Sequence, residues 1–348
     1  MAITLNEQIK QHNAYINRVI LSIPNFGMLE GEEKFLANRR LSIGGSDVGA
    51  ILGISKYKTP YAVWLEKTGR AEPQKETKHM HFGKVLESVV ADEYERVTGN
   101  KVHKVNQTLA CKSMPWLTAN LDRRVVYLQK VLECKTTNPF SFKRDDWGEG
   151  NQYTKTDHPN TPAKPVVLCD GIPDMYLLQC QHYLTVTGYL EADLAVLIGG
   201  NDLRIYTIVH NEMLAGIVAQ RLTDFWFNHV IADVPPEPTT PLEVDEFYGS
   251  KHDNGESITA TDEVLEALEE LKKAKEVKKK AENIVKEKES IIKRHMGENQ
   301  QLIDDSGNKL ASWKTYIKSS FQVTKFKENH PELAINFTEK TENRTFRV

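Results

Sequence analysis

The chain has 348 residues, of which 40% are hydrophobic and 27% charged, and 45 Lys and Arg against 48 Asp and Glu give a formal net charge of −3. This composition predicts a soluble globular protein of one large or two ordinary domains. No apolar run approaches the length of a membrane span, and the first residues lack the basic-then-apolar pattern of a signal peptide. The charge argues against a purely electrostatic DNA binder, but it does not exclude DNA, because acidic metal ligands can mask a basic channel.

The four cysteines form no CxxC pair, which weakens the case for a zinc or iron–sulfur site. They are Cys111, Cys134, Cys169 and Cys180. We expect reduced thiols and a cytoplasmic location.

Two helices are expected first, and the second has an acidic start and a basic end, as the helix dipole favours. They span residues 5–20 and 31–40. A glycine-containing turn follows, in which Ser46 or Asp47 could cap the next helix. Arg39 and Arg40 lie just upstream. The turn is therefore either a seat for a phosphate at a helix start or a simple capped turn, and the sequence supports both interpretations equally.

Two more helices are expected, at residues 60–68 and 78–97. The longer one carries an apolar stripe that we expect to be buried, made of Phe82, Val85, Leu86, Val89, Val90 and Tyr94. Glu87 borders this stripe three residues after Lys84, so both could face one cavity. A meander of strands follows, at residues 101–110, 117–122, 124–128 and 131–136.

The last strand of this meander brings acidic and basic side chains to one face. Because side chains alternate along a strand, Glu133 and Lys135 point the same way, and Leu132 and Cys134 point into the opposite, buried layer. Asp122 lies one short hairpin upstream and can reach the same patch. Two carboxylates and an ammonium suit Mg²⁺, and the lysine could orient or deprotonate a water that attacks phosphorus. The alternative interpretation is an exposed ion pair worth little.

An irregular polar stretch over residues 143–172 interrupts the pattern, and a stretch this long is usually functional or disordered. Pro173 is expected to open a helix that runs to about Thr187 and carries Gln179 and Gln181. Two strands and a helix are expected next, at residues 194–198, 203–209 and 211–231. This order of elements predicts an α/β (α+β) core with a mixed central sheet flanked by helices.

A proline-rich segment at residues 234–241 indicates a stiff linker and a domain boundary. The predicted organisation is a core domain, a linker and a C-terminal region, over residues 1–235, 236–260 and 261–348. The C-terminal region begins with a long charged helix capped by Thr261, whose narrow apolar line is typical of a helical hairpin or coiled coil. Strand-like alternation is expected after it and again at the last four residues.

Five segments, in order and with compatible gaps, resemble those of the YqaJ-type viral recombinase nucleases, relatives of phage lambda exonuclease in the PD-(D/E)xK superfamily. They are Arg39–Asp47, Phe82–Glu87, Asn120–Asp122, Leu132–Lys135 and Gln179–Tyr183. The resemblance spans about residues 35–235. The chain departs from the family at Leu121, where a proline is usual, and at Arg123, where relatives often have glycine.

The resemblance implies a PD-(D/E)xK nuclease core whose acidic residues bind Mg²⁺, with Mn²⁺ as a substitute. Asp122 and Glu133 would be the metal-binding carboxylates, and Lys135 would be the lysine of the motif. Glu87 would complete the metal shell from the preceding helix.

The resemblance also implies roles for residues outside the acidic strand. Gln179 or Gln181 would hold the attacking water or a phosphate of the cut strand. Arg39 or Arg40, together with Ser46, would receive the 5′ end of that strand.

By the same resemblance, the protein would degrade linear duplex DNA 5′ to 3′, leaving a 3′ single strand for phage recombination by strand annealing. Such enzymes typically form trimeric rings around DNA and work with a single-strand annealing protein. Two alternatives stay open: a nicking or sequence-directed endonuclease of the same fold, and a non-catalytic DNA-binding recombination scaffold whose charged cluster is structural. The scattered cysteines disfavour a metal-binding redox module.

Overall fold

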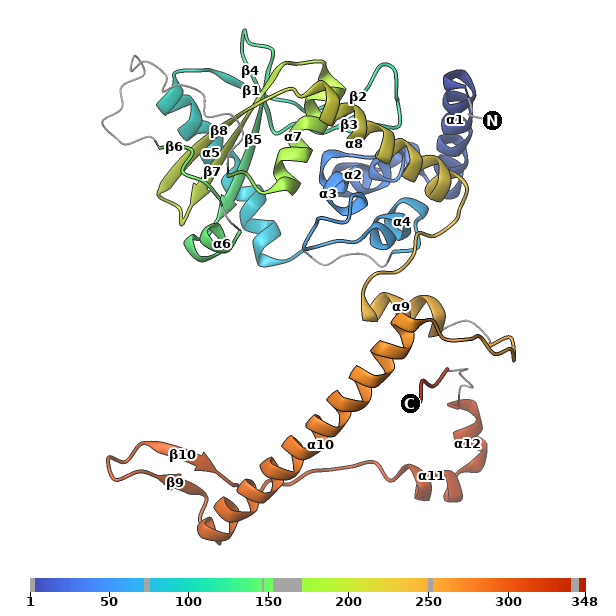
Figure 1. The fold of residues 1–348 in the computed structure, drawn as a ribbon, viewed down its shortest axis with the longest axis vertical. Coiled ribbons are helices and arrows are strands. Elements are labelled where there is room, and N and C mark those ends of the chain that lie inside the picture. The colour runs from blue at the N-terminus through green and yellow to red at the C-terminus, as the bar shows by residue number, and fades with distance from the viewer. Residues whose placement is uncertain (1–3, 72–75, 146, 153–170, 250–252, 339–343) are drawn as a thin grey trace. The chain divides into compact units, whose positions relative to one another are not determined.

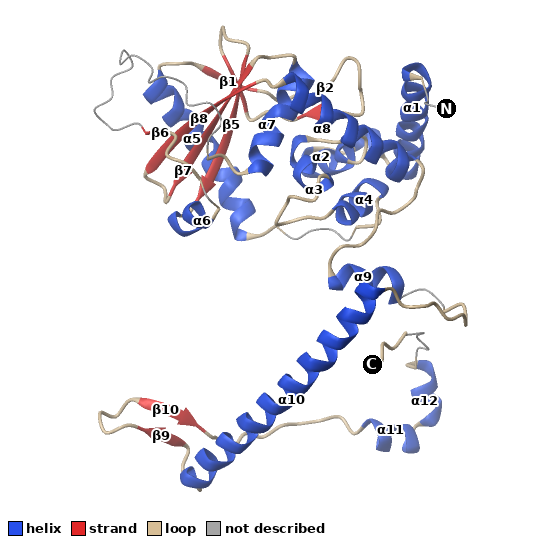
Figure 2. Cartoon of the chain, in the orientation of Figure 1, coloured by secondary structure: helices blue, strands red, loops and turns tan. Residues whose placement is uncertain are grey.

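A computed structural model describes residues 4–71, 76–145, 147–152, 171–249, 253–338 and 344–348. The chain divides into two compact units, Met1–Glu243 and Val244–Val348, and each is described here by itself (Figures 1 and 2). Within the described ranges, no helix combines the length and the apolar character that crossing a membrane requires.

The first unit is built around a six-stranded mixed sheet with the strand order β1-β4-β5-β7-β8-β6. Strands β5 and β7 are parallel, and each of the other pairs in this sheet is antiparallel. The strands are β1 (Val102–Lys104), β4 (Arg123–Val125), β5 (Lys130–Thr137), β6 (Asn151–Gln152), β7 (Glu191–Ile198) and β8 (Asp202–Val209). A separate pair consists of β2 (Leu109–Ala110) and β3 (Thr118–Ala119). The predicted mixed central sheet is confirmed.

Helices α5 (Lys78–Thr98) and α7 (Asp174–Thr187) flank this sheet (Figure 2), as predicted. The other helices of the unit are α1 (Leu5–Ser22), η1 (Phe26–Met28), α2 (Gly31–Arg39), α3 (Gly45–Ile51), α4 (Pro60–Thr68), α6 (Pro139–Arg144), α8 (Glu212–Phe225) and the π-helical η2 (Trp226–Ile231). Threonine hydroxyls cap the starts of α4 and α5, and left-handed glycines end α4, α5 and α7, which explains why these boundaries agree closely with the sequence.

The alternation along β5 decides which helix meets which side chains. Leu132 and Cys134 lie in a buried apolar cluster with Val90 and Tyr94 of α5. Glu133 points to the other face, where its carboxylate meets α7. Helices α5 and α7 therefore cover opposite faces of the sheet at β5.

Several predicted strands are shorter in the structure. Residues 101–110 form two short strands instead of one, and the strands predicted at 117–122 and 124–128 are reduced to β3 and β4. Strand β4 ends at Val125 because the chain turns at Tyr127, whose φ of 64° lies in the left-handed region.

The apolar stripe of α5 is buried only in its second half. Val90 and Tyr94 are fully buried, whereas Phe82, Val85 and Val89 are 57%, 51% and 47% exposed. The cluster that packs on the sheet begins at Val90. The expectation that the whole stripe is buried was therefore wrong: the periodicity identifies the side of the helix but not how far the sheet extends beneath it.

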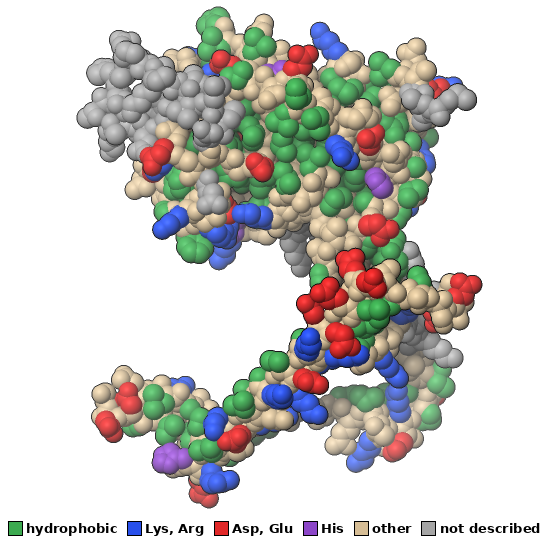
Figure 3. Space-filling view, viewed as in Figure 1, with side chains coloured by type: hydrophobic (Ala, Val, Ile, Leu, Met, Phe, Trp, Pro, Cys, Tyr) green, Lys and Arg blue, Asp and Glu red, His purple; other side chains and the backbone are tan. Residues whose placement is uncertain are grey.

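The second unit is dominated by one long helix with little buried surface. Helix α9 (Pro241–Gly249) begins inside the segment predicted to be a linker. Helix α10 (Asp262–Met296) starts after Thr261, whose hydroxyl accepts the Val264 N–H as a cap. Its first turns are acidic, and lysines mixed with glutamates follow along the rest, so red side chains gather near its start and blue and red ones are mixed further along in Figure 3. Of its residues, only Met296 is buried.

Smaller elements follow α10, namely β9 (Gln301–Ile303), β10 (Lys309–Ser312), α11 (Val323–Asn329) and α12 (Pro331–Asn336). The β9–β10 turn is closed by Asp304, whose carboxylate accepts the Ser306 and Asn308 N–H groups at 3.0 and 2.8 Å. The strand expected at the last four residues is not observed among residues 344–348.

Candidate active site

Glu133 is the centre of a polar cluster on the α7 side of β5. Its side chain is buried, Lys135 Nζ lies 2.5 Å from its Oε1, and Gln179 Nε2 donates to the same oxygen at 2.7 Å. Gln179 is itself oriented by the Tyr183 hydroxyl at 2.8 Å. The second carboxylate oxygen of Glu133, Oε2, is buried and has no hydrogen-bond partner among the described residues. That oxygen is an acceptor available to a ligand.

Asp122 joins this cluster from the chain just before β4. Its Oδ2 accepts a hydrogen bond from the Cys134 backbone N–H at 2.8 Å. Burial, followed by the charge of Glu133, raises the pKa of Asp122 from its ordinary 3.8 to about 8, although Lys135 opposes the shift. The hairpin thus brings two carboxylates into one small buried volume.

A divalent cation fits this pair of carboxylates. Oε2 of Glu133 lacks a donor, and burial followed by the charge of Glu133 raises the pKa of Asp122, so a hard cation bound between them would stabilise both carboxylates. Among the described residues, no group of three or more His, Cys, Asp or Glu side chains is placed to hold a metal ion. An ion would therefore rest on Asp122 and Glu133, with waters and substrate phosphate completing its shell, which is the usual arrangement for Mg²⁺.

Glu87, the predicted third metal ligand, has a different partner. Its Oε1 lies 2.5 Å from Nη1 of Arg123, which also donates to the Asp122 carbonyl at 2.7 Å. Arg123 is the residue at which the sequence departs from the resemblance described above, and nothing in the sequence pattern indicated this ion pair. A metal-binding role for Glu87 would require it to leave Arg123, and it stays a prediction.

Lys135 is held as a cation. Burial alone would lower its pKa, but the carboxylates of Glu133 and Asp122 raise the pKa above its ordinary value of 10.5. A lysine with a raised pKa is a poor base near neutral pH. Of the two roles suggested by the sequence, the geometry favours orienting a water over deprotonating it.

The two predicted glutamines of α7 occupy different environments. Gln179 faces Glu133, whereas Gln181 is buried against the backbone: its Nε2 donates to the Val209 carbonyl at 2.7 Å and its Oε1 accepts the Asn211 N–H at 3.0 Å. Gln181 therefore fastens α7 to the end of β8 and the start of α8. The interpretation that placed it at the reacting groups is corrected, because side chains two apart on a helix do not face the same way.

Replacing each glutamine by leucine separates these two positions. Gln181→Leu is expected to lower the free energy of unfolding by about 0.5–1.5 kcal/mol, because the buried side chain loses its hydrogen bonds to the Val209 carbonyl and the Asn211 N–H. Gln179→Leu is expected to weaken Mg²⁺ binding at Asp122 and Glu133 by about tenfold or more, because Glu133 loses a donor that orients it. Urea denaturation and Mg²⁺ titration of the folded protein check both, and unchanged Mg²⁺ binding by Gln179→Leu would contradict the positioning role.

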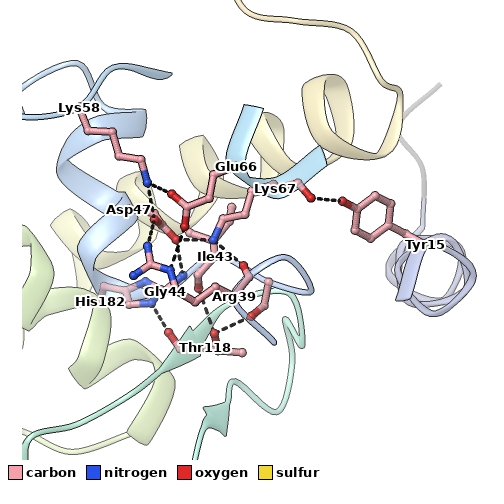
Figure 4. A network of polar contacts seen from close by, with 11 residues as sticks. Tyr15, Arg39, Ile43, Gly44, Asp47, Lys58, Glu66, Lys67, Thr118 and His182 are labelled. Carbon is pink, nitrogen blue, oxygen red and sulfur yellow. Dashed lines mark hydrogen bonds and ion pairs between the residues drawn. The ribbon is translucent and has the colours of Figure 1, made fainter. Parts of the chain in front are cut away.

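A second polar network surrounds Arg39, where α2, α3 and α4 meet (Figure 4). Arg39 bonds Asp47 at 3.0 Å and Glu66 at 2.9 Å. Lys67, which is 1% exposed, donates to Asp47 Oδ2 at 2.6 Å and to the Arg39 carbonyl at 2.7 Å. Lys58 pairs with Glu66. In formal charge, three cations meet two carboxylates, so the network keeps one net positive charge.

The other residues predicted to receive a 5′ phosphate lie beside this network. The Arg40 guanidinium lies 3.4 and 3.5 Å from two backbone carbonyls of α4. Ser46 is exposed in the first turn of α3. Gly44, rather than Ser46 or Asp47, is the N-cap of that helix, and the Asp47 carboxylate reaches back to the Gly44 N–H at 3.0 Å. Their proposed role in phosphate binding stays a prediction.

The buried Lys67–Asp47 pair is expected to matter for stability. Burial would raise the pKa of Asp47, but Lys67, Arg39 and Lys58 hold the pKa well below its usual range. Lys67→Met leaves this carboxylate buried with fewer partners and should lower the free energy of unfolding by about 3–5 kcal/mol. Urea denaturation checks this, and adding Asp47→Asn to Lys67→Met should restore part of the loss. A cost below about 1 kcal/mol would show that Arg39 and Lys58 stabilise the buried Asp47 carboxylate without Lys67.

Comparison with known proteins adds independent findings. Residues 34–190 match the YqaJ-like viral recombinase domain. The chain is 29% identical over 322 residues to the "Uncharacterized protein YqaJ" of Bacillus subtilis (strain 168), covering 91% of this chain and 93% of that one. It is also similar to the alkaline exonuclease LHK-Exo from Laribacter hongkongensis, at 18% identity and a TM-score of 0.43 over 58% of this chain and 94% of that one. A phage related exonuclease from Haemophilus somnus 129PT matches at 11% identity and a TM-score of 0.40, over 55% and 96%.

Proposed function

We propose, because residues 34–190 match the YqaJ-like viral recombinase domain, that this protein is a metal-dependent deoxyribonuclease with a PD-(D/E)xK core. In this proposal it degrades linear duplex DNA 5′ to 3′ and leaves a 3′ single strand for recombination by strand annealing. The observation that carries the proposal is the buried cluster of Asp122, Glu133 and Lys135, with one carboxylate oxygen left unpartnered.

The chain's own residues would perform most of the work at the phosphate. Asp122 and Glu133 would hold Mg²⁺ or Mn²⁺, which when bound neutralises charge on the attacked phosphate and activates a water. Lys135, fixed on Glu133 at 2.5 Å, would orient the attacking water and stabilise negative charge that develops on the phosphate. Gln179 would keep Oε1 of Glu133 occupied, so that Oε2 faces the ligand.

The network around Arg39 supports a seat for the 5′ end of the cut strand. It carries one net positive charge, and Arg39 is only partly buried, with a side chain 25% exposed. Arg40 and the exposed hydroxyl of Ser46 would add donors to a terminal phosphate. Asp47 and Glu66 would hold the Arg39 guanidinium in place before DNA arrives.

End-labelled linear duplex DNA with Mg²⁺ tests the proposal. The 5′ label should be released first, and a 3′-labelled strand should persist as single-stranded DNA. Covalently closed circular DNA should remain intact. Cutting of the circle would instead identify a nicking or sequence-directed endonuclease, and absence of both cleavage and Mg²⁺ binding would identify a DNA-binding scaffold.

The assembly and the partner are also part of the proposal. A homotrimeric ring would retain DNA by enclosing it, which suits a chain with a net charge of −3. An annealing protein would receive the 3′ strand. Sizing in solution tests the first point, since a strict monomer with high processivity would contradict a ring. A version lacking residues 244–348, assayed separately for cleavage and partner binding, tests whether the second unit docks the partner.

A further inference from the structure

Arg123 lies beside the metal site proposed above but takes no part in the chemistry assigned to that site. It begins β4, directly after Asp122, and its side chain is only 9% exposed. Its Nη1 lies 2.5 Å from Glu87 Oε1 and donates to the Asp122 carbonyl at 2.7 Å. Burial of a guanidinium is costly unless its charge and its donors are matched. This cation is therefore held by a carboxylate of α5 and by the backbone next to the site.

The register of the sheet places Arg123 and Glu87 on one side of the acidic hairpin. Arg123 is opposite Leu132 in the pairing of β4 with β5, and cross-strand partners share a face of the sheet. Leu132 packs against α5, the helix that carries Glu87. Glu133 points to the opposite face, toward α7. Glu87 therefore approaches the hairpin from the side of Arg123, and its carboxylate meets the guanidinium there.

The charge of Glu87 nevertheless reaches the metal site. Burial is the largest cause that raises the pKa of Asp122, and the carboxylates of Glu133 and Glu87 add to it. Arg123 supplies the opposite charge to Glu87 at 2.5 Å, so the two side chains together have no formal net charge. Within the described ranges, Glu87 does not join Asp122 and Glu133 in a group of three side chains that could hold a metal ion.

A site of two carboxylates binds Mg²⁺ differently from a site of three. Each further carboxylate adds negative charge and an oxygen ligand, and both raise the affinity of the protein for the ion. With two carboxylates, the ion keeps several waters and takes up substrate phosphate to complete its shell. Holding Glu87 away from the ion therefore keeps the affinity of the protein without DNA low.

We propose that Arg123 sets the Mg²⁺ affinity of this site by holding Glu87 out of the metal shell. Arg123 is thus a positioning residue, which acts through Glu87 and touches neither the ion nor the DNA. The ion rests on Asp122 and Glu133. The inference rests on the proposed function, because it concerns the metal of that reaction.

Calorimetric titration of the full-length protein with Mg²⁺, without DNA, measures the effect. Arg123→Met removes the guanidinium and frees the Glu87 carboxylate, so it should bind Mg²⁺ about tenfold more tightly than the wild type. Glu87→Gln leaves Arg123 as an uncompensated cation beside the site, so it should bind Mg²⁺ about tenfold more weakly. The double variant that combines both changes has no net charge at the pair, and it should bind Mg²⁺ as the wild type does.

The double variant separates this proposal from a direct ligand role for Glu87. If Glu87 ligates the ion, Glu87→Gln and the double variant both lose an oxygen ligand, and both bind Mg²⁺ more weakly than the wild type. That result would overturn the proposal. Equal affinities of the wild type and Arg123→Met would overturn it too, because the guanidinium would then have no influence on the ion. So would an absence of Mg²⁺ binding by all four proteins.

Controls exclude effects of net charge and of folding. Arg96 and Glu93 form another guanidinium–carboxylate pair further along α5, at 2.7 Å and with both side chains more exposed. Arg96→Met and Glu93→Gln repeat the two changes of charge and should leave the Mg²⁺ affinity unchanged. Arg123→Gln, which can still donate to the Asp122 carbonyl, replaces Arg123→Met if that variant is poorly folded, and the same tightening is expected.

Metal binding and cleavage are measured separately in this design. The titration involves no DNA, so its result does not depend on whether the protein cuts DNA. Failure of the proposed function would instead appear as absence of cleavage of linear duplex DNA by the wild type with Mg²⁺.

Discussion

Glu133→Gln is expected to reduce DNA cleavage by about a thousandfold or more while the protein stays folded. The glutamine keeps the shape of the side chain and can still accept from Gln179, but it removes the charge that faces the ligand through Oε2. Loss of several kcal/mol of transition-state stabilisation corresponds to a rate change of this size. Asp122→Ala and Lys135→Ala should likewise abolish cleavage without unfolding the protein. Cleavage of linear duplex DNA and circular dichroism measure the two effects.

The same two strands supply a matched control for Glu133. Lys130 at the start of β5 pairs with Glu191 at the start of β7 at 2.9 Å. This is a second Lys–Glu pair on the strands, and it lies at the other end of β5 from Lys135. Glu191→Gln should leave cleavage unchanged, because Glu191 is 44% exposed and lies at the other end of the paired strands from Lys135. Comparable losses in Glu191→Gln and Glu133→Gln would mean that the loss reflects general disturbance of the sheet.

Mg²⁺ binding gives a readout of Glu133 that does not involve DNA. An ion held by Asp122 and Glu133 stabilises the folded state, so Mg²⁺ should raise the melting temperature of the wild type and of Glu191→Gln. It should not raise that of Glu133→Gln. An equal rise in all three would place the ion elsewhere on the chain.

Features fixed by local chemistry could be predicted from the sequence. Helix α4 begins at Pro60 and ends at Thr68 as predicted, because Thr59 caps it and Gly69 follows in a left-handed conformation. The alternation along β5 placed Glu133 with Lys135 and Leu132 with Cys134 on opposite faces, since a strand has a period of two whatever surrounds it.

Features that depend on distant partners could not be predicted. Phe82 looks like a core residue on the α5 stripe, but it is exposed because the sheet does not extend beneath that part of the helix. Gln181 looks like a site residue beside Gln179, but it is held by the backbone of β8 and α8. The Arg123–Glu87 pair and the stacking of Trp147 on Tyr176 join segments whose proximity no local pattern encodes.

The raised pKa of Asp122 predicts how metal binding depends on pH. In the folded protein this carboxyl titrates at about 8, against 3.8 ordinarily, so between these values the folded state binds more protons than the unfolded state. Stability from this group is therefore fully present below about pH 4 and is lost as the pH rises through 8 when no metal is bound. Asp122→Asn carries no such proton, so it should be less sensitive than the wild type to a rise from pH 6 to pH 9.

Mg²⁺ should reverse this loss, because an ion on Asp122 replaces the proton. Below pH 8, each unit of pH should strengthen Mg²⁺ binding by about tenfold, as the ion no longer competes with a proton for the carboxylate. We therefore expect the Mg²⁺-induced rise in melting temperature to be small at pH 6 and large at pH 9, with cleavage at limiting Mg²⁺ following the same curve. Asp122→Asn should show little Mg²⁺ stabilisation at either pH. If the wild type gained equally from Mg²⁺ at pH 6 and pH 9, the ion would not compete with the Asp122 proton, and the paired carboxylates would not be its site.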